Sequence, residues 1–206
     1  VYFVIEFSKP FEKFEPIDEY GFYYRIHFNT TEGEQIGVKV AISTVSVDGA
    51  RQNFEAELAG VEFDAARKSA YDKWNKEISK IRIEGATAEQ EEIFYTGMYH
   101  MYVAPSLLSD VDGKYRGADN EVYDNPGFDT YTTFSLWDTY RAKLPLMTIT
   151  HPEMMDDIVN TMIDIYKKQS FLPIWHLWAC ETGCMVGSPG IIVVADAVAK
   201  GIEGID

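Results

Sequence analysis

The sequence predicts an α+β fold in which strands come first and helices follow. About the first fifty residues hold apolar runs rich in β-branched and aromatic residues, which is the composition of strands. Beyond them, apolar residues recur at the three- and four-residue spacing of helices. The change of period falls near Gly60 and divides the chain into two units, residues 1–60 and residues 61–206.

Strands are expected over residues 1–7, 21–28 and 35–43, with turn-forming residues between them. Their pattern is typical of the last strands of a β-sandwich whose earlier strands are absent. The chain opens inside the first apolar run without a Met, and it ends at Asp206 without a stopping element. Both ends are therefore expected to be cuts in a longer polypeptide. We therefore expect a multidomain fragment whose signal segment lies outside the chain.

Helical periodicity marks several segments after the strands, at residues 48–58, 64–81, 87–105, 132–150, 154–169 and 191–200. Asp48 and Asp64 are the expected N-caps of the first two helices. Thr87 and Gln90 have the spacing of a capping box at the start of the third helix.

Prolines and glycines are expected to bound the later helices. Pro145 predicts a kink or an end, whereas Pro152 suits the first position of the next helix. Gly201 is expected to close the last helix. Residues 107–131 are rich in Gly, Asp and Asn and predict a long loop, and residues 171–190 predict an irregular segment.

The composition excludes several kinds of partner. A net charge of -15 and a pI of about 4.6 repel nucleic-acid phosphates and anionic lipid surfaces. No apolar run is long enough to span a bilayer. The two cysteines, Cys180 and Cys184, form neither a disulfide framework nor a zinc set. Aromatic residues, 14% of the chain, suit both a packed core and a sugar site, and core packing is preferred for most of them.

An acidic segment, Asp110 to Gly113, is the first candidate site. Alternating acidic residues before a Gly can supply oxygen ligands to calcium. The Gly stands fourth, however, whereas a calcium loop of the EF-hand type needs it sixth. The pattern favours an acidic turn, and no metal ligand is assigned within the chain.

Trp137, Asp138 and Arg141 form the second candidate. A carboxylate can accept hydrogen bonds from two sugar hydroxyls while an adjacent ring stacks on the sugar. Arg141, about one helical turn on, would hold that carboxylate ionised. An intrahelical Asp–Arg pair beside a core Trp explains the same spacing equally well, and the residues leave this choice open.

Trp175, His176 and Glu181 lie in the irregular segment near the C-terminal end. Trp175 suits a sugar-stacking ring or a core ring, and a lone His is more often a structural donor than a catalyst. Burial of Glu181 among apolar neighbours would raise its pKa, as a general acid requires. A Glu that caps a following helix would look the same in sequence.

Taken in order, these segments resemble the glycoside hydrolase family 92 pattern of exo-acting α-mannosidases. The matching stretches cover nearly the whole chain, at residues 2–11, 94–100, 109–117, 131–141, 172–175 and 181–187. The resemblance implies the C-terminal edge of a β-sandwich over residues 1–60 and the first helices of a truncated (α/α)6 barrel over residues 61–206. It also implies calcium dependence and hydrolysis of terminal α-linked mannose with inversion.

The same resemblance implies a site. Asp138 would bind mannose hydroxyls and Trp175 would line the same subsite, with Trp137, Arg141 and Glu181 as further substrate-binding residues. The general acid, the general base and most calcium ligands are expected downstream of Asp206. The implied partners are a mannose-containing glycan and the remainder of the parent polypeptide, in a periplasmic or secreted setting.

Two departures from the family pattern stand close to this site. Ala179-Cys180 occupy positions where the family usually has Gly-Asn, and Ser188-Pro189 stand where it has an aromatic residue and a His. The alternatives to an α-mannosidase segment are a non-catalytic carbohydrate-binding domain, using Trp137, Asp138 and Trp175, and a structural domain.

Overall fold

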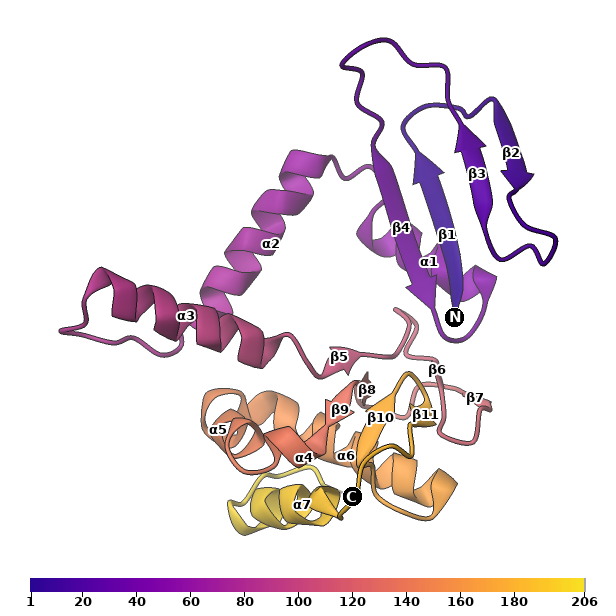
Figure 1. Ribbon diagram of the computed structural model, residues 1–206. Helices are drawn as coiled ribbons and strands as arrows, with labels where there is room; N and C mark the ends of the chain where they lie inside the picture. Colours follow the sequence, from indigo (N-terminus) through magenta and orange to yellow (C-terminus); the bar gives the residue numbers. More distant parts are fainter. Residues whose placement is uncertain (206) are drawn as a thin grey trace.

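The strands of residues 2–43 lie at one end of the molecule and the packed helices of residues 136–199 lie at the other (Figure 1). The structure is a computed structural model that describes residues 1–205. Within this range it has seven α-helices and several small antiparallel sheets, which confirms a mixed fold of strands and helices. No helix of the described residues is long and apolar enough to cross a membrane.

The first sheet has one covered face and one open face. Strand β1 (Tyr2–Phe7) pairs antiparallel with β4 (Val38–Ser43), with Phe3 opposite Ile42. Ala41 and Ser43 point to the covered face, where helix α1 (Val47–Glu57) packs on the sheet, and both are buried. Apolar side chains on the opposite face remain exposed, namely Phe3, Ile5, Val38, Val40 and Ile42.

A separate two-stranded sheet is the antiparallel hairpin of β2 (Lys13–Pro16) and β3 (Tyr24–His27). Strand β3 lies inside the run predicted from the sequence, whereas β2 was not predicted. Its alternation of Lys13 and Glu15 with Phe14 is too short to show a period.

Helix α1 (Val47–Glu57) begins after Ser46, whose hydroxyl accepts a hydrogen bond from the Gly49 amide. The expected cap, Asp48, lies instead in the first turn. Ser46 takes the cap position because its backbone is extended and its side chain reaches the third amide of the helix. A Cβ on Gly49 would lie 2.3 Å from the Asp110 carboxylate, so this glycine allows α1 to approach the 110–113 turn closely.

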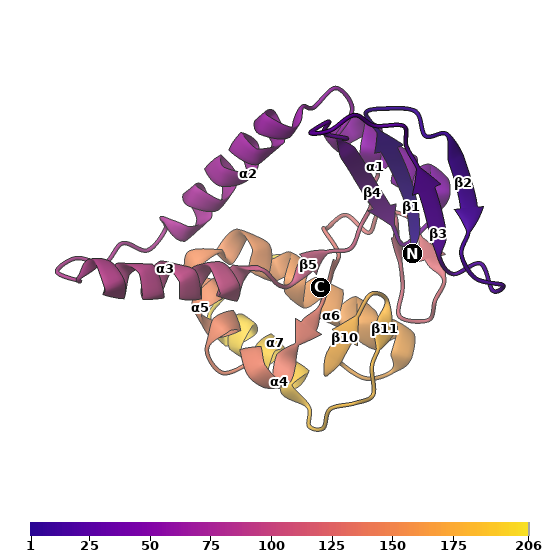
Figure 2. The same ribbon diagram turned by 45° about the horizontal axis from the view of Figure 1, so that its top comes forward.

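Helices α2 (Phe63–Ile78) and α3 (Ala88–Tyr102) form an arm that extends away from the rest of the chain (Figures 1 and 2). Asp64 lies inside α2 rather than at its cap, which is Glu62. The capping box of Thr87 and Gln90 at the start of α3 is confirmed. An ion pair between Lys80 and Glu153, 3.1 Å apart, ties the arm to the next helices.

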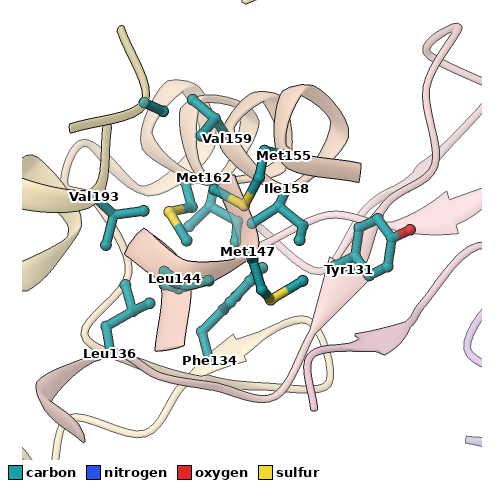
Figure 3. Packing of buried hydrophobic residues seen from close by; sticks show 12 residues of the cluster. Tyr131, Phe134, Leu136, Leu144, Met147, Met155, Ile158, Val159, Met162 and Val193 are labelled. Atoms are coloured by element: carbon teal, nitrogen blue, oxygen red, sulfur yellow. The ribbon is translucent and has the colours of Figure 1, made fainter. Parts of the chain in front are cut away.

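The main core lies among α4 (Leu136–Thr139), α5 (Lys143–Thr150), α6 (Pro152–Gln169) and α7 (Pro189–Ala199). Figure 3 shows the side chains that meet there, and several of them are fully buried, including Leu136, Leu144, Met155, Ile158, Val159 and Met162. The expected position of Pro152 in the first turn of α6 and the expected closure of α7 at Gly201, with φ +74°, are both confirmed.

One helix prediction was wrong. Residues 132–150 do not form a single helix but contain β8 (Tyr131–Thr132), β9 (Phe134–Ser135), α4 and α5. Thr133 has φ +66°, which breaks a helical path at once. Pro145 neither kinks nor ends α5, because it stands in the first turn, where a backbone amide needs no partner within the helix.

The predicted loop at 107–131 holds short strand pairs. Strand β5 (Ser106–Leu107) pairs with β8, and β6 (Tyr115–Arg116) pairs with β7 (Val122–Tyr123). The Lys168 ammonium of α6 lies 5.3 Å from the Tyr115 ring and 4.0 Å from the Tyr123 ring. These cation–π contacts fix the segment on the helical unit.

Candidate functional site

A small three-stranded sheet brings the distant candidate segments together. Strand β10 (Trp175–Leu177) lies between β9 and β11 (Cys180–Glu181), and all pairs are antiparallel. Trp175 stands opposite Ser135. The Leu136 amide also donates to the Ile174 carbonyl at 3.1 Å. The sheet therefore places the segment that carries Asp138 beside the segment that carries Trp175.

Asp138 lies at the exposed surface of the short helix α4. Its carboxylate accepts a hydrogen bond from the Ser135 hydroxyl at 2.7 Å. Because Ser135 is the strand partner of Trp175, Asp138 and Trp175 are connected through this one residue. That the two side chains line one sugar pocket stays a prediction.

Arg141 does not form an ion pair with the Asp138 carboxylate. Among the ion pairs of residues 1–205, none joins Arg141 to Asp138, and the guanidinium lies 6.0 Å from the Tyr140 ring centre. The intrahelical Asp138–Arg141 pair, one of the two alternatives that the spacing left open, is not formed, because α4 ends at Thr139 and the two residues do not share a continuous helix. The Trp137 side chain is 43% exposed and lies outside the buried core cluster of the described residues.

Glu181 holds the backbone of the neighbouring strand. Its carboxylate accepts hydrogen bonds from the amides of Ile174 at 2.9 Å, Trp175 at 3.1 Å and Gly183 at 3.3 Å. The alternative of a cap on a following helix is wrong, because the next helix, α7, begins only at Pro189. The geometry assigns this carboxylate a positioning task, since it fixes the strand segment from which the Trp175 ring projects.

His176 is buried beside these residues with 1% of its surface exposed. Neither ring nitrogen has a hydrogen-bond partner among the described residues. Burial lowers the pKa of the imidazole to about 4, and the nearby Glu181 carboxylate opposes this shift. The ring is therefore neutral at neutral pH, where it makes no charge change that a proton shuttle would need.

The turn between β10 and β11 has an unusual backbone. It consists of Trp178 and Ala179, with φ +52° and φ +24°. Positive φ values are uncommon for residues with a Cβ atom. The sequence gives no signal for this turn, because residues 174–180 contain no Gly, Pro, Asn, Asp or Ser.

The acidic segment near Asp110 forms a turn held by hydrogen bonds. The Asp110 carboxylate accepts from the Ser43 hydroxyl at 2.6 Å and from the Asn53 amide group at 2.8 Å. Asp112 forms an ion pair with Lys114 at 2.6 Å. No group of three or more His, Cys, Asp or Glu side chains within residues 1–205 is placed to hold a metal ion.

Comparison with known proteins assigns the chain to a class. A profile of the glycosyl hydrolase family 92 catalytic domain matches residues 49–206. The family GH92 α-mannosidase BT3965 of Bacteroides thetaiotaomicron superposes on 99% of the chain, with a TM-score of 0.89 and 36% identity. The family GH92 inverting mannosidase BT2199 of the same organism superposes on 99% of it, with a TM-score of 0.86 and 28% identity.

A curated fungal relative, an uncharacterized secreted glycosidase of Arthroderma benhamiae, is 24% identical over 187 residues, or 89% of this chain. The chain spans 30% of BT3965, 29% of BT2199 and 20% of the fungal protein. These matches place it among the glycoside hydrolases. Within that class, the chain belongs to glycoside hydrolase family 92, because the family profile covers most of its residues.

Proposed function

We propose that this chain is part of an inverting α-mannosidase that removes terminal α-linked mannose from glycans. The observation that carries the proposal is the sheet β9–β10–β11, which brings the Asp138 and Trp175 segments together in a family 92 chain. A structure of BT3965 in complex with mannoimidazole, 36% identical to this chain, supports a mannose-like ligand.

In the proposed site, Asp138 accepts hydrogen bonds from mannose hydroxyls and Trp175 stacks on the sugar ring. Trp137 and Arg141 flank Asp138 from the same segment and contact the substrate at its edge. Glu181 keeps the backbone of Trp175 in place through the amide hydrogen bonds described above. The Ser135 hydroxyl orients the Asp138 carboxylate by donating a hydrogen bond to it.

Inversion needs two carboxyl groups about 6.5–9.5 Å apart, with a water molecule between the base and the sugar. We place this pair outside the chain, in the rest of the parent polypeptide. Calcium bound to the whole protein would polarise sugar oxygens, and its ligands also belong mainly to the rest of the polypeptide.

The proposed architecture follows the family. Residues 1–60 form the last strands of an N-terminal β-sandwich with its linker, and residues 61–206 form the first part of an (α/α)6 barrel. The open apolar face of β1 and β4 supports this, since a sandwich requires a second sheet on that face. We also propose a periplasmic or secreted location, which the secreted fungal relative supports.

The test is Asp138→Ala in the full-length protein, assayed on an aryl α-mannoside. Loss of a carboxylate that binds the substrate through charge-assisted hydrogen bonds is expected to lower kcat/KM at least roughly a hundredfold. Asp72→Ala on the arm is the matched control, because Asp72 is exposed and forms only a surface pair with Lys68. Unchanged turnover by Asp138→Ala would contradict the proposed site.

A further inference from the structure

The acidic turn that begins at Asp110 contacts the strand unit (residues 1–60) through one buried carboxylate. Asp110 is 6% exposed. One of its carboxylate oxygens accepts a hydrogen bond from the Ser43 hydroxyl at 2.6 Å, and the other accepts one from the Asn53 side-chain amide at 2.8 Å. Ser43 ends β4 and Asn53 lies in α1, so both oxygens bond to the strand unit. These three side chains form the Asp110 contact.

The Ser43 hydroxyl can only donate to Asp110. Its oxygen accepts hydrogen bonds from the backbone amides of Val45 at 2.9 Å and Ser46 at 3.2 Å. A hydroxyl oxygen has two acceptor lone pairs, and these amides occupy both of them. The hydroxyl hydrogen is therefore left for the carboxylate, and the facing atom at position 110 must be an acceptor.

The Asn53 side chain is also held in one orientation. Its oxygen accepts from the Val111 amide at 2.9 Å, and its nitrogen donates to the Ile42 carbonyl at 2.9 Å as well as to Asp110. The group at position 110 must therefore accept at two atoms. An ionised carboxylate does so, whereas an amide of the same shape would place its NH2 group against a donor.

The hairpin after the acidic turn joins the strand unit to the helical unit (residues 61–206). Arg116 of β6 donates to the carbonyls of Thr44 at 2.7 Å and Val45 at 3.3 Å. The same hairpin is fixed to α6, because the Lys168 ammonium lies against the rings of Tyr115 and Tyr123. The segment around Asp110 therefore decides how the two units lie against each other.

This segment also reaches the candidate sugar site. Just before Asp110, β5 pairs with β8, and the Leu108 amide donates to the Thr130 carbonyl at 2.7 Å. Strand β8 leads into β9 and the segment that carries Asp138. A cavity lined by β4, α1 and the turn after β10 lies beside the sheet of the site, so the placement of the strand unit sets one of its walls.

We propose that Asp110 is a positioning residue for the sugar site. Its carboxylate holds the strand unit on the helical unit, and this task requires the ionised acid rather than any polar side chain of the same shape. The effect on activity rests on the proposed mannosidase function, whereas the hold on the strand unit is measured without substrate.

The experiment compares Asp110→Asn with Asp112→Asn in the full-length protein. Asp112 is the matched control, because it lies in the same turn and its carboxylate bonds only to Lys114. In Asp110→Asn, backbone amides of residues 38–57 and 106–116 should exchange hydrogen at least about tenfold faster, while the rest of the chain keeps its rates. With an aryl α-mannoside, KM should rise about tenfold and kcat should stay, because the contact touches no reacting group.

An exchange of side chains separates this contact from a general loss of stability. Asn53→Asp alone sets two carboxylates against each other and should also speed exchange. Combined with Asp110→Asn, it again sets a donor against an acceptor, so the double variant should exchange more slowly than either single variant. If Asp110→Asn does not fold, recovery of folding by the double variant supports the contact and failure to recover overturns it.

Equal exchange rates in Asp110→Asn and Asp112→Asn would overturn the proposal, as would additive effects in the double variant. Faster exchange with a wild-type KM would overturn the positioning role. A wild-type protein without mannosidase activity would contradict the proposed function, and the exchange rates would still decide whether Asp110 holds the strand unit.

Discussion

Ala179 has a backbone conformation that residues with a Cβ atom rarely adopt. Its φ is +24°, and a glycine reaches such values without strain. Ala179→Gly is therefore expected to raise the free energy of unfolding by about 1 kcal/mol, because the left-handed region costs an L-residue roughly that much. Denaturant unfolding measures the change.

The control for this substitution is Ala70→Gly. Ala70 is exposed in the interior of α2, where a glycine is expected to lower stability by about 0.5–1 kcal/mol. The two changes should thus have opposite signs. Destabilisation by Ala179→Gly would show that the methyl group has a packing role that outweighs the backbone strain.

His176 predicts a dependence of stability on pH. Its pKa is about 4 in the folded protein, against an ordinary value of 6.5. Between these values the unfolded chain binds a proton that the folded chain does not, so stability is lost as pH falls from about 6.5 toward 4. Between pH 7 and pH 4.5, wild type should lose roughly 2 kcal/mol more than His176→Phe.

Urea unfolding at a series of pH values measures this difference. His100→Phe is the control, because His100 is exposed on α3 and its replacement should leave the wild-type pH profile in place. Parallel profiles for wild type and His176→Phe would show that the buried imidazole takes up a proton in the folded state.

At the residue scale, the sequence indicates which side chains belong to the site but not how they interact with the backbone. Asp138, Trp175 and Glu181 stood out because their chemistry is visible in the residue type. The bonds from Glu181 to backbone amides depend on the pairing of β10 with β11, and strands of two and three residues are too short to leave a period in the sequence. The positive φ of Thr133 was hidden as well, because β-branched residues rarely adopt it.

At the scale of elements, helices with strong start and stop signals were predictable. The helix from Pro152 and the capping box at Thr87 depend on local rules, and the structure confirms both. The structure of residues 132–150 was not predictable in this way, because β8 is held by pairing with β5 and β9 by pairing with β10. Two-residue strands are too short to leave a period in the sequence.

The capping box can be tested by Thr87→Ala. The substitution removes the acceptor of the Gln90 amide at the start of α3 and is expected to cost about 1 kcal/mol of stability. Thr96→Ala, at an exposed position inside the same helix, is the control, and it should be neutral or slightly stabilising because Ala is the better helix former. Thermal unfolding of the two variants measures both effects. An equal effect of the two would mean that the Thr87 cap contributes nothing.

At the scale of the whole molecule, the exposed apolar surface is the main feature. One face of the β1–β4 sheet is open, and α2 has no buried residue. Contiguous apolar surface of this kind marks a missing partner or a tendency to aggregate. The chain spans 30% of BT3965, and we propose that the remainder of the parent polypeptide covers these faces.

The central proposal is that this chain supplies sugar-binding residues to an α-mannosidase, whereas the acid and base lie elsewhere in the polypeptide. The most direct measurement compares aryl α-mannoside hydrolysis by the full-length protein and by residues 1–206, with folding confirmed by circular dichroism and with and without added calcium. The full-length protein should hydrolyse the substrate, and the isolated segment should show no turnover above a blank. Clear turnover by the isolated segment would contradict the proposal and would require Glu181 and a second local carboxylate to be catalytic.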